Sequence, residues 1–204
     1  KRKICVTIAI FFTLCSGCAS PEPKLFGQGV PEEVELAESL SKRLLDDVLA
    51  LRGYSVMPED LSVGHIEIDD ISMAHARYYQ RFAGIPVFNG EAIVHLNSDG
   101  SLFGITDELI HDIRLDDSGS SILSPDDAIQ RVLSEYECPE CLSEKPEADL
   151  WVFRRADRDT LAYRIQLRRE DGTERTSLPV IFSDARTGAQ IWAYDNLQTI
   201  LGKG

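Results

Sequence analysis

The stretch 75-HARYYQRFAGIPVFNGE-91 carries the densest local folding instructions in this chain. It combines aromatic residues typical of strands with the turn formers Gly84, Pro86 and the pair Asn89-Gly90. This composition predicts a strand, a tight turn, a short strand, a second turn and a further strand. The stretch supplies no nucleophile, general base or metal-binding set, so its own residues favour an architectural role.

The flanking residues extend this stretch into a sheet packed on a helix. Residues 65–69 and 91–96 alternate apolar and polar side chains, and 97-NSDG-100 predicts a tight turn before a returning strand at 102–105. Upstream, apolar residues recur at three- and four-residue steps, which predicts an amphipathic helix. The predicted core positions of that helix are Val34, Ala37, Leu40, Leu44, Val48 and Leu51.

The helix is expected to begin at Pro31 and to end at Arg52-Gly53, since proline suits a first turn and glycine a helix end. Residues 31–115 therefore predict a first domain with one helix against an antiparallel meander. The polar, Gly- and Ser-rich residues 116–123 predict a linker.

A second domain is predicted over residues 124–195. Ser124 is the expected N-cap and Pro125 the first residue of a helix. Turn formers at 157–159 and 170–172 separate the strands that follow. Those strands are expected at 149–154, 160–168, 178–184 and 189–194. The predicted fold class is α+β, with two small helix-on-antiparallel-sheet units.

The first 30 residues predict export. A basic head, Lys1-Arg2-Lys3, precedes an apolar run and small residues, which is typical of a signal peptide over 1–20, and a polar tether follows at 21–30. Ser16-Gly17-Cys18 resembles the end of a bacterial lipobox, although Cys15 stands where that motif has Leu. Cys18 is thus the lipidation candidate for a membrane-anchored lipoprotein; the alternative is a soluble secreted protein.

The net charge and the positions of the cysteines limit the functions that this chain can have. A net charge of −13 should repel nucleic acid. Of the five cysteines, only Cys138 and Cys141 lie in the body of the chain. Their spacing allows half a zinc site or a redox pair, but export to an oxidising space favours a local disulfide.

No catalytic constellation emerges from the sequence, so no catalytic or metal residue is assigned and the chain itself is not expected to be an enzyme. The four histidines are His65, His75, His95 and His111, and none forms a zinc motif on a helix. His75 and His95 lie on predicted strands and could approach each other. A pair of hydrogen-bonded sheet histidines is the favoured interpretation over a metal site.

The opening stretch resembles the FTP segment, the fungalysin/thermolysin-type propeptide. The residues that carry the resemblance are His75, Arg77, Gln80, Gly84, Pro86, Val87, Gly90, Glu91 and Asp99-Gly100. The second half resembles a PepSY (cystatin-like) domain at Ser124–Ala128, at 161–165 and at 181–188, with Asp184 and Gly188 in the last piece. Together the two halves look like the pro-region of a thermolysin-like, M4-type zinc metalloprotease precursor.

The resemblance implies an intramolecular chaperone and inhibitor of a zinc metalloendopeptidase, exported from a bacterium. The partner would be the cognate catalytic domain, which would follow residue 204, and residues 196–204 would approach the junction, with Gly202, Lys203 and Gly204 as its candidate. No cofactor is expected in this chain, and zinc and calcium are expected only in the protease domain. The alternative is a stand-alone exported lipoprotein that binds or inhibits proteases in trans.

Overall fold

The computed structural model describes residues 24–27, 29–115, 121–170, 172 and 176–197. The predictions for the signal peptide, for Cys18 and for Gly202–Gly204 lie outside the described residues. Residues 21–23 and 28 of the predicted tether and 116–120 of the predicted linker also lie outside them.

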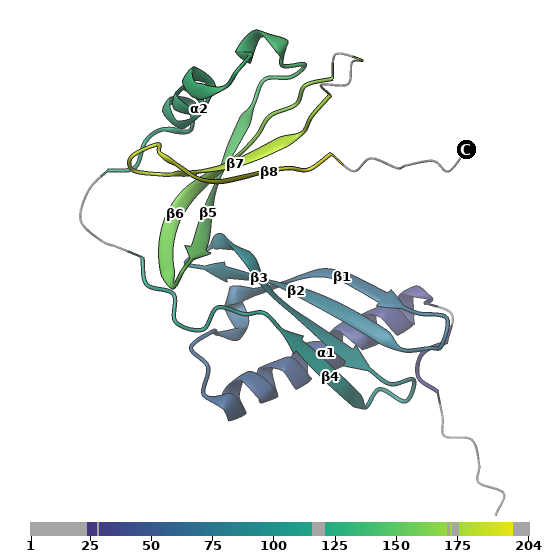
Figure 1. Cartoon of the computed structure of the whole chain (residues 1–204). Helices are drawn as coiled ribbons and strands as arrows, with labels where there is room; N and C mark the ends of the chain where they lie inside the picture. Colours follow the sequence, from purple (N-terminus) through teal and green to yellow (C-terminus); the bar gives the residue numbers. More distant parts are fainter. Residues whose placement is uncertain (1–23, 28, 116–120, 171, 173–175, 198–204) are drawn as a thin grey trace, which may run out of the picture.

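The first unit packs one long helix on one face of an antiparallel sheet (Figure 1). Its elements are α1 (Pro31–Arg52), a 3₁₀ turn (Pro58–Asp60), β1 (Leu61–Ile68), β2 (Ala74–Phe82), β3 (Ile85–Leu96) and β4 (Leu102–Asp107). Proline and two glutamates occupy the first turn of α1, and Gly53 ends the helix in the left-handed conformation at φ 66°. Both ends agree with the sequence prediction, because each is set by local backbone chemistry.

The core face of α1 differs in part from the predicted one. Its buried residues are Ala37, Ser41, Leu45 and Leu49, while Leu51 is 87% exposed. The helix carries two overlapping apolar stripes, and packing against the sheet buries the one that contains Leu45 and Leu49 and leaves Leu51 outside the core.

A buried hydroxyl pair fastens α1 to the centre of the sheet. The Tyr78 hydroxyl on β2 lies 2.7 Å from the Ser41 hydroxyl, and Ser41 also donates to the carbonyl oxygen of Glu38 at 3.0 Å. Both residues are almost wholly buried. Burial raises the pKa of Tyr78 above its ordinary value, because the phenolate would lose its hydration.

The second unit repeats the arrangement of helix against sheet. It comprises α2 (Pro125–Glu135), a 3₁₀ turn (Pro139–Cys141), β5 (Glu147–Arg155), β6 (Arg158–Gln166), β7 (Pro179–Asp184) and β8 (Gln190–Asp195). The Ser124 side chain accepts a hydrogen bond from the backbone nitrogen of Asp127, as expected of an N-cap. Figure 1 shows α2 on one face of this sheet. The predicted α+β class is confirmed.

The opening stretch folds differently from its prediction in one respect. Ala83-Gly84 forms the expected tight turn, but β3 continues through Asn89-Gly90, where a second turn was predicted. The register between β2 and β3 passes from Tyr79↔Glu91 directly to Arg81↔Pro86. Asn89 has a positive φ of 58° within the intervening segment. The pair therefore lies in a large bulge of one long strand, in which residues 87–90 stand opposite the single residue Gln80.

Gln80 on β2 fills the space opposite this bulge. Its side-chain nitrogen donates to the carbonyl oxygen of Ile110 at 2.8 Å, and its side-chain oxygen accepts from the Ile110 nitrogen at 2.9 Å. The amide thus pairs with the segment after β4 as a strand backbone would. A Cβ on Gly90 would lie 2.6 Å from the Gln80 side-chain oxygen, so only glycine fits there without a shift.

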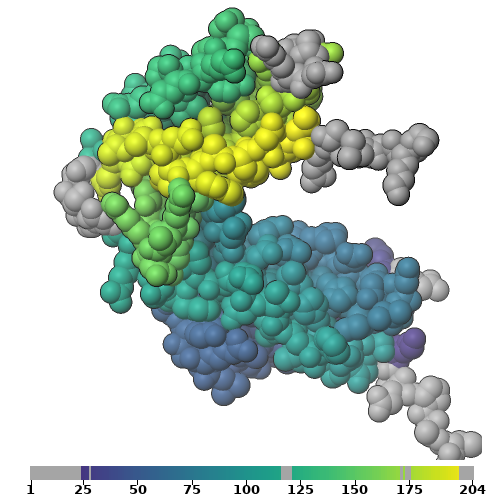
Figure 2. Space-filling model, in the orientation of Figure 1, coloured from purple at the N-terminus to yellow at the C-terminus, as the bar shows by residue number. Residues whose placement is uncertain are grey.

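The two sheets meet at this bulge. The strand order is β1-β2-β3-β5-β6-β7-β8, with β4 paired to β3, and the link between the units is a parallel bridge, Val87↔Val152. Figure 2 shows the second unit stacked above the first along this narrow junction.

Replacing Gly90 by Ala should lower the free energy of unfolding by about 1–3 kcal/mol, because the added methyl group overlaps Gln80. Gly104→Ala on β4 is the matched control, since a Cβ there meets nothing within 4 Å. Urea denaturation measures both. Equal stability of the two variants would contradict the close contact assigned to Gly90.

The raised pKa of Tyr78 predicts a loss of stability in alkali. The native state holds the phenol proton above pH ~10, where the unfolded chain releases it, so stability is full below pH ~10 and falls as pH rises further. Tyr78→Phe should cost about 1 kcal/mol at neutral pH and weaken this dependence. Urea midpoints between pH 8 and 11 measure it, and an unchanged slope in the variant would contradict the assignment.

Candidate functional site

The face of the first sheet that points away from α1, called here the outer face, carries three of the motif residues: His75, Arg77 and Glu91. His75, Arg77 and Tyr79 alternate along β2 with residues that face the helix, and Glu91 and His95 lie beside them on β3. Most of these side chains are half-buried. A polar, structured face of this kind is suited to contact with another protein.

Arg77 and Glu91 pair with each other across the outer face. The Arg77 guanidinium donates to the Glu91 carboxylate, and this hydrogen bond raises the pKa of Arg77 above its ordinary value. The side chains are 37% and 32% exposed, so water screens the pair and its contribution to stability is small. The pair links β2 and β3 diagonally, since Arg77 lies opposite Ile93 and Glu91 lies opposite Tyr79.

The two histidines form the centre of a polar chain that runs across β2, β3 and β4. The Nδ1 atoms of His75 and His95 lie 2.7 Å apart, His75 Nε2 lies 3.1 Å from the Asp69 carboxylate, and His95 Nε2 lies 3.1 Å from the Thr106 hydroxyl. Burial, and then the charge of His75, hold the pKa of His95 below its usual value. The predicted contact between these histidines is therefore present.

Phe88 joins the two units by hydrophobic contact. It projects from the bulge of β3 onto the face of the second sheet opposite α2, where its ring centroid lies 4.6 Å from that of Phe182, 5.5 Å from Phe153 and 5.6 Å from Trp192. Phe153 and Phe182 are buried. Aromatic contacts of this kind are among the strongest that one side chain can make.

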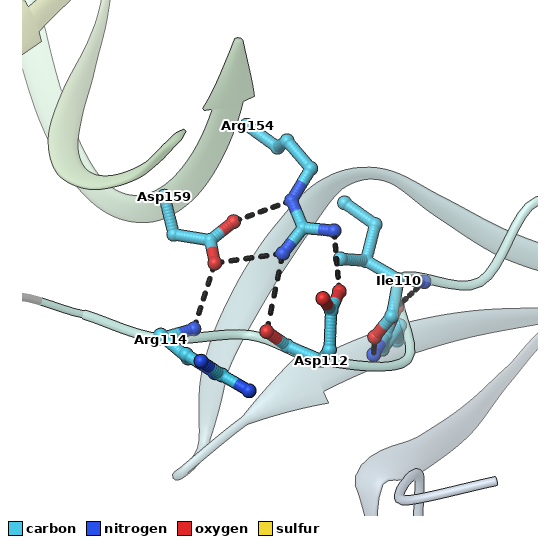
Figure 3. A network of polar contacts seen from close by, with 6 residues as sticks. Ile110, Asp112, Arg114, Arg154 and Asp159 are labelled. Carbon is cyan, nitrogen blue, oxygen red and sulfur yellow. Dashed lines mark hydrogen bonds and ion pairs between the residues drawn. The ribbon is translucent and has the colours of Figure 1, made fainter. Parts of the chain in front are cut away.

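A polar network forms the second joint (Figure 3). The Arg154 guanidinium, at the end of β5, donates to both carboxylate oxygens of Asp159 at 2.7 and 2.8 Å and to the Asp112 carboxylate at 2.7 Å. The backbone nitrogen of Arg114 also donates to Asp159, at 2.7 Å. Asp159 raises the pKa of Arg154, and the same arginine lowers the pKa of Asp112.

This network depends on exact pairing, because one of its charged groups is buried. The Asp159 side chain is 3% exposed, whereas that of Asp112 is 69% exposed. A buried carboxylate is tolerated only with partners such as Arg154 and the Arg114 nitrogen. The segment that follows β4 is thereby fixed to the β5–β6 hairpin of the second unit.

A partly apolar pocket opens beside the junction. It has a volume of about 420 Å³ and is lined by Tyr79, Pro86, Phe88 and Trp151 among others. The Tyr79 side chain is 47% exposed at its rim. We call this pocket and its rim the junction pocket. A second, more polar pocket of about 530 Å³ lies at the end of the first unit, where His111 stacks on Tyr54.

The remaining motif residues have local structural roles. Gly84 supplies the positive φ of the β2–β3 turn, and the Asp184 carboxylate accepts from the backbone nitrogens of Arg186 and Thr187 in the turn after β7. Gly188 closes that turn, where a Cβ would lie 2.2 Å from Arg131 Cδ. Each of these residues shapes the backbone and contributes no reactive group.

Cys138 and Cys141 are joined by a disulfide at the 3₁₀ turn after α2. Among the described residues, these two and Glu140 form a group of three potential metal ligands. The disulfide removes the thiolates that would bind a metal, so this group is structural in its oxidised form.

Three residues of the junction could not be singled out from the sequence. Asp159 was predicted to lie in a turn over 157–159, but the turn is centred on Ala156 and Asp157, and Asp159 is a buried residue of β6. Arg154 and Asp112 carried no pattern that sets them apart from other surface charges. Arg154 bonds Asp159, 5 residues away in the same unit, and Asp112, 42 residues away in the other unit. The contact with Asp112 is the one that joins the two units.

Within the described part of the chain, none of the helices has the length and apolar character needed to cross a membrane.

Comparisons with known proteins find a family motif in the sheet of the first unit. Residues 60–109 match the family model described as the Fungalysin/Thermolysin Propeptide Motif. Bacillolysin of Brevibacillus brevis is 27% identical over 142 residues, which cover 64% of this chain and 26% of that protein. The solved Bacillus megaterium YpeB C-terminal domain aligns with a TM-score of 0.43 at 16% identity, covering 81% of this chain and 66% of that one.

Phe88→Ala should lower the free energy of unfolding by about 2 kcal/mol, roughly half the loss for a fully buried phenylalanine. It should also change the fluorescence of Trp151 and Trp192 and separate the melting of the two units. Phe103→Ala, at a side chain 69% exposed, should stay within about 0.5 kcal/mol. Calorimetry with tryptophan emission measures both variants, and one unchanged transition for Phe88→Ala would contradict the joint.

Proposed function

We propose that this chain, whose residues 60–109 form the fungalysin/thermolysin propeptide motif, is the pro-region of a thermolysin-like zinc metalloendopeptidase. In this role it assists the folding of a catalytic domain that would follow residue 204 and inhibits that domain until the two are separated. The chain would be exported as part of the precursor. The motif match over the first unit is the observation that carries the proposal.

The placement of the motif side chains supports a role without chemistry of its own. Arg77 is paired with Glu91, Gln80 is bonded to the Ile110 backbone, and Gly84 and Gly90 serve the backbone geometry. Residues used in this way build a surface of fixed shape. A pro-region needs such a surface, because its function is to recognise another chain.

The rigidity of the junction supports the chaperone part of the proposal. Phe88 and the Arg154 network hold the two sheets in one arrangement before any partner is present. A preformed surface that binds a partly folded protease lowers the entropy lost when distant segments of that protease come together. The same surface, once bound tightly, would cover part of the folded enzyme and inhibit it.

The junction pocket is the contact point that we assign to the catalytic domain. Its rim carries the half-exposed Tyr79 ring, and its lining includes Pro86 and Trp151. Aromatic side chains beside a small pocket are typical of the residues that contribute most to binding between proteins. The expected occupant is an apolar side chain of the catalytic domain.

The experiment mixes the purified chain with a denatured and, separately, with a folded M4-type catalytic domain. The chain should raise the yield of active protease on refolding and inhibit the folded enzyme at a stoichiometric ratio. Tyr79→Ala should weaken inhibition by about tenfold or more, since it removes a contact of the hot-spot type. Phe103→Ala is the control, because its exposed ring lies outside the junction pocket.

The outcomes separate the two candidate functions. Neither a gain in refolding nor inhibition would overturn the proposal. Inhibition without any gain in refolding would favour a module that inhibits proteases in trans. Equal inhibition by the Tyr79 and Phe103 variants would place the contact outside the junction pocket.

A further inference from the structure

The histidine pair on the outer face is not used by the proposed function. His75 and His95 stand directly opposite each other on β2 and β3, and their Nδ1 atoms lie 2.7 Å apart. The sequence favoured a simple hydrogen bond between them. The structure contains that contact and adds partners that orient both rings.

We propose that His75 and His95 bind a late first-row divalent cation, zinc or copper, through their Nδ1 atoms. Imidazole nitrogen is a preferred ligand of both ions. With Zn–N bonds of about 2.0–2.1 Å and tetrahedral angles, the two nitrogens need to be about 3.3 Å apart. Starting from 2.7 Å, the two nitrogens need to move apart by about 0.6 Å, and both rings need to turn so that their lone pairs converge on one point.

The other ring nitrogens already have the partners that a metal site requires. His75 Nε2 faces the Asp69 carboxylate at 3.1 Å, so this nitrogen carries a proton and leaves Nδ1 free to accept. A carboxylate behind a histidine is the usual outer partner of a metal ligand, since it fixes the ring and increases its basicity. Asp69 is itself held by the backbone nitrogens of Ile71 and Met73.

His95 can also free its Nδ1 atom for a metal, by transferring one proton from Nδ1 to Nε2. When both rings are neutral, its Nδ1 donates to His75 and its Nε2 accepts from the Thr106 hydroxyl, 3.1 Å away. Metal binding at Nδ1 transfers that proton to Nε2, and the hydroxyl then accepts the hydrogen bond. A hydroxyl can serve in either direction, so the change leaves every nitrogen satisfied.

The surroundings leave room for the remaining ligands. Gly104 is the β4 residue opposite His95, and a Cβ there would meet nothing within 4 Å. Glu67 is the β1 residue opposite His75, so its side chain emerges on the same face at cross-strand distance. Water beside Gly104 supplies the remaining ligands, because the Glu67 carboxylate lies beside His65, 4.0 Å from its Nε2 atom.

The test is a calorimetric titration of the full chain, with its disulfide intact, with zinc chloride at pH 7.5. The wild-type chain should bind zinc with a component that His75→Gln and His95→Gln each weaken by tenfold or more. Asp69→Asn and Thr106→Ala should weaken it several-fold, as outer partners do. His111→Gln is the matched control, because His111 is also half-buried beside an aspartate yet lies away from the pair.

Electron paramagnetic resonance of the chain loaded with one equivalent of Cu²⁺ gives a second measurement, which detects the coordinated nitrogens directly. Two coordinated imidazole nitrogens in wild type and one in His95→Gln support the site. The absence of zinc binding at micromolar protein would overturn it. Binding that survives both histidine replacements, or a copper spectrum without imidazole nitrogen, would also overturn it.

Discussion

The bulge of β3 opposite Gln80 is the constraint on which the rest of the structure depends. Between the pairs Tyr79↔Glu91 and Arg81↔Pro86, a single residue of β2 faces a longer run of β3. The extra length pushes Phe88 out of the first sheet and into the aromatic cluster of the second. It also places Val87 against Val152, the bridge that joins the two sheets. Without the bulge, β3 would be an ordinary strand of an isolated small unit.

Gln80 connects the bulge to a third segment of the chain. A bulge interrupts the ladder between two strands, and here the Gln80 side chain occupies the space beside the interruption. The Gln80 amide pairs with both backbone groups of Ile110 and so ties the segment after β4 to the same place. That segment then supplies Asp112 and the Arg114 nitrogen to the Arg154 network. The hydrophobic joint and the polar joint between the units therefore share one origin.

The two joints differ in character, and together they give a defined orientation. The Phe88 cluster contributes area and little direction, because apolar contact tolerates small rotations. The polar network contributes direction, since across the junction Arg154 donates to Asp112 and the Arg114 backbone nitrogen donates to the buried Asp159 carboxylate, and such bonds are sensitive to geometry. A two-unit surface held in this way can recognise a partner without first losing orientational freedom, which suits the proposed pro-region.

Much of the fold was accessible from the sequence because it is encoded locally. Gly53 ends α1, Ser124 caps α2, and the strand periods identify most strands, as short-range backbone chemistry requires. Asn89-Gly90 was misread as a turn, because a positive φ suits either a turn or a bulge, and only pairing with β2 distinguishes them. Leu51 was assigned to the core for a similar reason, since the sheet selects which apolar stripe of α1 is buried. The histidine contact was foreseen from strand positions, but its Asp69 and Thr106 partners were not.

By itself, the sequence determined the α+β class, the helix ends and the motif residues of the first unit, because each depends on neighbours a few positions away. The tertiary structure alone decided that the opening stretch contains a bulge and that Phe88 leaves its own sheet. It also decided that Asp159 is buried beside Arg154 and the backbone nitrogen of Arg114. These outcomes depend on pairings between distant segments, whose energies arise only when β3, β5 and the segment after β4 meet. Within residues 75–91, each side chain limits the local conformations that its position can adopt, and pairing with the neighbouring sheet selects one of them.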